Sequence, residues 1–201
     1  MAFILQSFKN SLRELRSVKC ITTVGVFIAL FVVLDGFGSI RIGEFLKINF
    51  AFLALAVIGM LFGPTVGLLS GFACDLVGYL VNPVGGFIVW LSLITALEGM
   101  LYGFFLYTLK PEKTLKQVLR IALARGVVVV VCNLLLNTIA LYSYGFIGGD
   151  GRGFFTVLWT RVISNAIALP VGVVMLVAIL IPIKLAYRKM FPSYDRNHVG
   201  G

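Results

Sequence analysis

A small set of polar and aromatic side chains could do chemistry in this sequence, and most of them lie inside apolar runs. Together they offer hydrogen-bond donors and acceptors, aromatic faces and two cations, which suits the binding of a flat polar molecule that carries anionic groups. The candidate binding residues are Lys47, Asp75, Tyr79, Trp90, Asn133, Asn137, Arg161 and Asn165.

Other kinds of chemistry find little support. The three cysteines, Cys20, Cys74 and Cys132, are widely spaced in or beside apolar runs, and the single histidine, His198, lies in the polar tail, so neither a disulfide framework nor a metal centre is expected. No Gly-x4-Gly-Lys-Ser/Thr phosphate loop occurs, so the chain cannot hydrolyse ATP through that machinery. No cofactor is predicted.

A membrane enzyme acting on lipid-linked substrates is an alternative from another class. Such enzymes bring paired carboxylates or metal ligands to one face at the level of the lipid headgroups. Here Asp35, Asp75 and Glu98 occupy scattered positions, and the enzyme hypothesis is therefore disfavoured. A third hypothesis, a purely structural assembly subunit, predicts that loss of Arg161 perturbs stability without changing ligand uptake.

Composition indicates what must position these residues. Of 201 residues, 60% are hydrophobic and 12% are charged, against about 25% charged in soluble domains. The mean hydropathy is +1.03. A chain of this kind cannot cover a globular surface with polar groups, so we predict an all-α integral membrane protein. The basic residues that give the net charge of +9 lie between the apolar runs rather than along one folded face. This pattern is typical of residues that set membrane topology and does not favour nucleic-acid binding.

We predict that six apolar runs cross the bilayer, since a helix rises about 1.5 Å per residue and the hydrocarbon core is about 30 Å thick. The Gly63-Pro64 pair should end the second and start the third, and Pro170 should kink the last. The predicted spans are residues 20–38, 48–62, 65–81, 87–109, 121–142 and 157–183.

Basic residues set the orientation. Groups of four precede the first span, separate the fourth from the fifth, and follow the sixth, so that twelve of the 17 lie on one side if the spans alternate. The positive-inside rule then places both termini in the cytoplasm of a multi-pass cell-membrane protein. We expect a basic amphipathic segment over 1–19 lying on the inner leaflet, a six-helix membrane domain over 20–186, and a polar cytoplasmic tail over 187–201.

With this topology, most polar side chains of the spans fall at one depth near the outer face, which predicts a polar pocket open to the outside. Structural alternatives remain for several members. Arg161 could pair with Asp75, Asn133 and Asn137 could join helices, and Trp90 and Tyr79 could belong to an interfacial aromatic belt. Lys47 could snorkel to the interface, and Glu98, near mid-depth, could bond a neighbouring helix.

Glycine motifs predict close helix contacts. Gly67-x3-Gly71 and Gly99-x3-Gly103 are expected to form smooth internal strips. Gly25-x3-Ala29 lies toward the cytoplasmic end of the first span and could dock another membrane protein. The glycine-rich stretch 148–153 has no strand before it, so a flexible external lid is expected there rather than a phosphate loop.

The order of several short motifs resembles the S component, the substrate-binding membrane subunit, of an energy-coupling factor (ECF) vitamin transporter, most closely its folate branch. The resemblance runs from about residue 16 to residue 184. The motifs are Leu46-Lys47-Ile48-Asn49-Phe50, Leu61-Phe62-Gly63-Pro64-x-x-Gly67, Asp75-Leu76-x-Gly78, Leu97-Glu98-Gly99-x-x-Tyr102-Gly103, and Thr160-Arg161-Val162-Ile163-Ser164-Asn165 with Pro170.

The resemblance implies six helices, a vitamin bound with high affinity in an outward-facing cavity, and assembly with a membrane coupling subunit and two cytoplasmic ATPases. It implies that Gly25 and Ala29 contact the coupling subunit, with glycine where the family usually has alanine. Folate is the expected vitamin, with Arg161 or Lys47 on its anionic or carbonyl groups. An S component for pantothenate, a pyrimidine or another small metabolite is the alternative.

Overall fold

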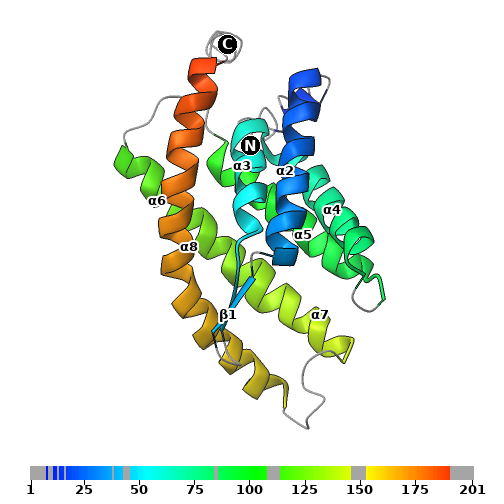
Figure 1. Ribbon diagram of the computed structural model, residues 1–201. Helices are drawn as coiled ribbons and strands as arrows, with labels where there is room; N and C mark the ends of the chain where they lie inside the picture. The colour runs from blue at the N-terminus through cyan, green and yellow to red at the C-terminus, as the bar shows by residue number, and fades with distance from the viewer. Residues whose placement is uncertain are drawn as a thin grey trace.

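The computed structural model of the protein describes Phe8, residues 11–12, 14–15, 17–37, 39–42, 46–83, 86–107, 114–145 and 153–190. In these ranges the chain folds into a bundle of helices with one short β-hairpin (Figure 1). The predicted lid over 148–153 lies mostly outside the described residues. The expected all-α class is confirmed, and the hairpin is an addition to it.

The elements follow the predicted spans closely, with some shifted ends. They are α2 (Val18–Phe37), β1 (Ser39–Ile42), β2 (Leu46–Asn49), α3 (Phe52–Phe62), α4 (Pro64–Val81), α5 (Val89–Leu106), α6 (Thr114–Val128), the π-helix η1 (Val129–Leu136), α7 (Asn137–Ser143) and α8 (Phe154–Met190).

The second predicted span, 48–62, is wrong at its start. Residues 46–49 form a strand that pairs antiparallel with β1, and the helix begins at Phe52. The Asn49 side chain ends the strand: its Nδ2 donates to Asp35 Oδ1 at 2.5 Å, and its Oδ1 accepts from the Ala51 amide at 2.8 Å. A local amide of this kind competes with helical hydrogen bonding.

Helix α3 occupies the centre of the bundle. Its eleven residues are all buried, and it contacts α2, α4, α5 and α8. At about 1.5 Å per residue it extends roughly 16 Å, too short to cross the hydrocarbon core alone. Five other stretches of helix are long and apolar enough to span. In place of the second predicted span, the structure therefore has the strand β2 followed by a short, fully buried core helix.

The break between α3 and α4 falls where the sequence predicts it. Gly63 has a φ of 90°, which side chains disfavour, and Pro64 starts α4. The buried Ser11 lies against this break. Its Oγ donates to the Phe62 carbonyl at 2.7 Å and accepts from the amides of Thr65 and Val66 at 3.1 Å. This part of the N-terminal segment is thus docked on the bundle, and Ser11 satisfies orphan groups of both helices.

Glycines bring α4 and α5 into backbone contact. A methyl group on Gly67 would overlap the Gly99 carbonyl oxygen, and one on Gly99 would overlap the Gly67 carbonyl. A methyl group on Gly71 would similarly meet the backbone of Thr95, and one on Gly103 would lie 2.6 Å from Pro64. The prediction that both Gly-x3-Gly strips are internal contacts is confirmed.

The fifth predicted span is a continuous helix with a wider middle. In η1, hydrogen bonds close over five residues, as between the Asn137 amide and the Cys132 carbonyl. π-helical turns are rare and often occur at functional sites. Here the π segment carries Asn133 and delivers Asn137 at the first position of α7.

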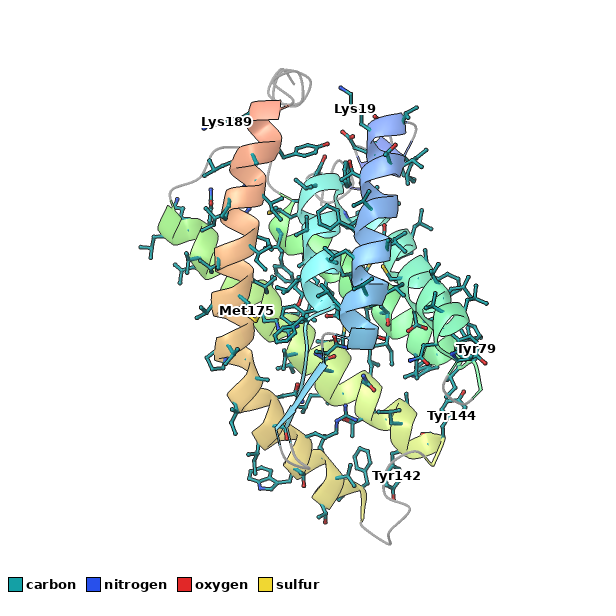
Figure 2. All side chains as sticks on the ribbon, viewed as in Figure 1. Lys19, Tyr79, Tyr142, Tyr144, Met175 and Lys189 are labelled. Carbon is teal, nitrogen blue, oxygen red and sulfur yellow. The ribbon has the colours of Figure 1, made fainter. Side chains whose placement is uncertain are left out.

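Helix α8 runs over 37 residues and continues through Pro170 and Pro182. Its length of about 55 Å exceeds a hydrocarbon core of about 30 Å, and Figure 1 shows it following a curved path down one side of the bundle. Lys19 of α2 and Lys189 of α8 lie at one end of the molecule, whereas Tyr79, Tyr142 and Tyr144 lie toward the other (Figure 2). We call these the basic end and the tyrosine end.

Candidate ligand-binding site

Part of the predicted site lies on α4 and α5. Asp75 is half-buried and accepts a 2.5 Å hydrogen bond from Ser92, whose side chain is fully buried. One turn further along α4, the Tyr79 ring contacts the Phe87 ring, with 5.2 Å between centroids. Trp90, at the start of α5, is 46% exposed and presents an accessible aromatic surface. This first group offers a carboxylate beside aromatic rings.

A second group lies on η1, α7 and the N-terminal half of α8. Asn133 and Asn137 are both half-buried, and the Asn137 Oδ1 atom is buried without a hydrogen-bond partner in the described part of the chain. Arg161 is half-buried on α8, and the side chain of Asn165 donates to the Arg161 carbonyl at 2.9 Å. A buried carbonyl oxygen without a partner costs free energy, and a ligand N–H would remove that cost.

Lys47 joins the second group through its backbone position. It sits on β2 opposite Arg41, and β2 contacts α8. Its side chain lies outside what the structure describes. Two cationic residues, Lys47 and Arg161, therefore lie on elements that contact each other.

The two groups are linked through α5, which contacts both η1 and α7. Asp75 bonds Ser92 rather than Arg161, so the alternative in which Arg161 and Asp75 form a structural pair is not realised. The arrangement leaves a carboxylate on one side and a guanidinium on the other.

Sequence reasoning missed a buried charged cluster in the middle of the bundle. Arg125 Nη1 lies 3.8 Å from Glu98 Oε1 and donates to the Tyr102 hydroxyl at 2.8 Å. Its guanidinium carbon lies 3.7 Å from the centroid of the Phe52 ring, a cation–π contact. The Arg125 and Glu98 side chains are only 8% and 14% exposed. The guanidinium also packs on Gly172, where an added methyl group would lie 3.0 Å from Nε. The cluster thus connects α3, α5, α6 and α8.

The predicted boundary of the fifth span explains the miss. If the fifth span began at residue 121, Arg125 would lie about one turn from its cytoplasmic end, whereas Glu98 lies near the middle of the fourth span. The helix begins at Thr114 instead, so Arg125 lies about three turns inside it, and its 3.8 Å contact with Glu98 places the two side chains at the same level of the bundle. The usable signal was that two opposite charges on consecutive spans need partners at the same depth.

The arrangement is suited to recognition by hydrogen bonds and charge. Within the described ranges, no three His, Cys, Asp or Glu side chains come together as metal ligands, and the three cysteines are free and buried. The chemistry at the tyrosine end comes from amides, Asp75 and Arg161, with aromatic rings beside them.

The candidate partner surface lies on α2, which is the least buried of the five described helices that are long and apolar enough to span a membrane. Gly25 and Ala29 are both exposed, and a methyl group on Gly25 would meet nothing within 4 Å. Val26 and Leu30 flank them at 64% and 41% exposure. The strip is accordingly open along its length.

Comparison with known proteins gives a consistent picture. Residues 15–189 match the family described as "ECF-type riboflavin transporter, S component". The chain is 28% identical over 162 residues to a folate transporter FolT of Clostridium novyi, covering 81% of this chain and 88% of that one. It is 27% identical over 128 residues to a folate transporter FolT of Leuconostoc mesenteroides, covering 64% and 67%. A crystal structure of FolT bound with folic acid superposes with a TM-score of 0.65 and 32% sequence identity, over 79% of this chain and 89% of that one.

Proposed function

Because the chain belongs to the family of ECF-type riboflavin transporter S components, we propose that it is the substrate-binding membrane subunit of a vitamin importer and that its vitamin is folate. The observation that supports folate as the vitamin is the similarity, over 79% of the chain, to a FolT structure bound with folic acid. The family description names riboflavin, whereas the two relatives compared above are folate transporters. Riboflavin is therefore the second candidate.

The chemistry of the two residue groups supports folate. Folate has a flat pterin with donors and acceptors along one edge and a glutamate tail with two carboxylates. Asp75, Asn133, Asn137 and Asn165 supply matching acceptors and donors for the pterin, and the unpartnered Asn137 Oδ1 needs a donor. Arg161 and Lys47 supply cations for the tail, which riboflavin lacks. Trp90 and Tyr79 supply aromatic faces.

A titration tests the substrate directly. Purified protein should bind folate with a dissociation constant below 1 µM, measured by quenching of tryptophan fluorescence and by calorimetry. Riboflavin, pantothenate and a pyrimidine should fail to compete at a hundredfold excess. High-affinity riboflavin binding with no folate binding would replace the first candidate by the second.

The membrane arrangement we propose follows from the basic end. Lys19 and Lys189 lie at that end, and twelve of the 17 basic residues belong to the three segments of the sequence that we expect on one side of the membrane, so this end faces the cytoplasm and the tyrosine end faces outward in the cell membrane. The open Gly25–Ala29 strip on α2 docks the membrane coupling subunit, which links the chain to two cytoplasmic ATPases. Cysteine labelling of Lys189→Cys and Tyr144→Cys from the outside should modify only the second.

A further inference from the structure

Packing alone does not explain the buried charged cluster around Arg125. A buried ion pair is a poor source of stability, because apolar side chains of similar size often do as well or better. The hydrogen bonding of the cluster is also incomplete: within the described ranges, the buried Nε atom of Arg125 has no hydrogen-bond partner. What a guanidinium does supply is direction, since its planar group of donors fixes the angles of the groups around it.

The helix that carries Arg125 leads directly into the second group of candidate binding residues. Arg125 lies about one turn before η1, which begins at Val129. The helix then continues through Asn133 of η1 to Asn137 at the start of α7. The contacts of Arg125 therefore set the direction in which both amides leave the packed block of α3, α4 and α5.

Two further contacts of Arg125 lead to the remaining segments of that group. The guanidinium rests on Gly172 of α8, and Arg161 lies about three turns along the same unbroken helix. Phe52, whose ring centroid lies 3.7 Å from the guanidinium carbon, starts α3 and follows β2, which carries Lys47. One side chain thus contacts or adjoins every segment that carries the second group.

Glu98 and Tyr102 fix the guanidinium to the packed block. The Tyr102 hydroxyl accepts its 2.8 Å hydrogen bond, and Glu98 Oε1 lies 3.8 Å away. Both residues lie on α5, whose backbone meets that of α4 at Gly67 and Gly99. The guanidinium is therefore a fixed surface for α8. A change of about 4° in the angle of α8 there would move Arg161, about 17 Å away, by about 1 Å, more than the roughly 0.5 Å that a binding site tolerates.

We propose that Arg125 is a positioning residue of the vitamin site, which sets the angles of η1, α7 and α8 relative to the packed block. It holds the amides of Asn133 and Asn137 and the guanidinium of Arg161 at separations that one ligand can bridge. It acts through the helices and not on the ligand, because its side chain is only 8% exposed. This inference rests on the proposed function, since it requires a ligand at these residues.

The first experiment separates position from stability. The double variant Glu98→Met with Arg125→Met removes both charges and keeps the core filled, so the protein should fold but lose the fixed angles. Its folate affinity, measured by titration of the monodisperse protein, should fall about 10-fold or more. The matched control is Leu180→Ala, which opens a cavity at a buried position of α8. It should lower the melting temperature and leave folate affinity unchanged.

A distance measurement provides a readout that needs no ligand. Spin labels at Ile139→Cys on α7 and Ile163→Cys on α8, both about half exposed, report the separation of the two helices. In the double variant the distance distribution should shift or broaden, whereas Leu180→Ala should leave it unchanged. Unchanged folate affinity or unchanged label distances in the double variant would overturn the positioning role, as would an equal loss of affinity in Leu180→Ala.

The two proposals can fail separately. If the unmodified protein does not bind folate, the proposed vitamin is wrong, and the label distances alone decide the role of Arg125. If the double variant does not fold, Gly172→Ala decides. Its methyl group would lie 3.0 Å from Nε, so α8 must shift and folate affinity should fall several-fold, whereas Gly126→Ala has open space and should bind normally. Equal affinities of these two variants would exclude the positioning role.

Discussion

The block formed by α3, α4 and α5 and the part formed by η1, α7 and the first half of α8 are built on opposite principles. In the first, glycines place backbones in contact, and α3 is buried at every residue. In the second, amide and guanidinium groups are half-buried, and one buried acceptor on Asn137 has no hydrogen-bond partner in the described ranges. The tightest packing and the second group of candidate binding residues thus lie on different helices, whereas the first group shares α4 and α5 with the packing. Changes in the backbone contacts and changes in the second group should therefore be measurable separately.

The largest effect should come from the glycine contact. Gly67→Leu places a side chain where even a methyl group overlaps the Gly99 carbonyl, so α4 and α5 must separate. Overpacking of a tight contact costs about 3 kcal/mol or more, and here we expect loss of the monodisperse folded protein on size-exclusion chromatography. Gly25→Leu is the matched control, because space is open there. It should fold and bind folate but lose assembly with the coupling subunit. Equal damage from both would break the comparison.

The second-largest effect on stability should come from the contacts of Arg125, which connect the two parts. Arg125 contacts Glu98 and Tyr102 of the packed block and reaches Gly172 of α8. Arg125→Met leaves Glu98 as a buried charge without its partner, at a cost of about 3–5 kcal/mol.

The double variant Arg125→Met with Glu98→Met removes both charges and should recover much of the stability that Arg125→Met loses. Thermal unfolding in detergent measures both variants. If the two losses simply add, the 3.8 Å pair does not couple the helices.

The third effect falls on binding alone. Arg161→Ala, in the first half of α8, should weaken folate affinity about 10- to 100-fold, because a hydrogen bond to a charged group contributes about 1.5–3 kcal/mol. Its melting temperature should change little, since the guanidinium has no acidic partner among the described residues. Lys189→Ala, an exposed cation on the same helix, serves as the control and should leave affinity unchanged. A loss of stability with unchanged affinity would favour the structural-subunit hypothesis.

The smallest effect sharpens the description of the packed block. Ser11→Ala removes hydrogen bonds to Phe62, Thr65 and Val66 at the α3–α4 break and should cost about 1 kcal/mol, similar to the loss of a side-chain N-cap. Thr22→Ala, whose hydroxyl bonds only its own helix at Val18, should cost less. The pair can be compared by thermal unfolding, and a null result for Ser11→Ala would mean that the docked segment adds no stability.

The sequence predicts the fold well where hydrophobic length and glycine spacing decide it. The Gly63-Pro64 break and both buried Gly-x3-Gly strips follow from local chemistry. It fails where tertiary partners decide: residues 46–49 pair with β1, and α6 starts seven residues before the predicted span.

The candidate site divides in the same way. Depth along alternating spans predicts that the eight residues lie toward one end of the bundle, but depth says nothing of rotation about a helix axis. The π-helical turns of η1 alter that rotation at Asn133 and Asn137, and no propensity rule for this segment signals them. The Asp75–Ser92 bond likewise depends on how α4 and α5 face each other.

The unbroken course of α8 has a mechanical consequence. Gly172 rests against the Arg125 guanidinium, and Arg161 and Lys184 lie about 17 Å to either side of that contact along one stiff rod. Because the helix is unbroken between these positions, a displacement of the segment around Arg161 would be transmitted past the Arg125 contact to the segment around Lys184.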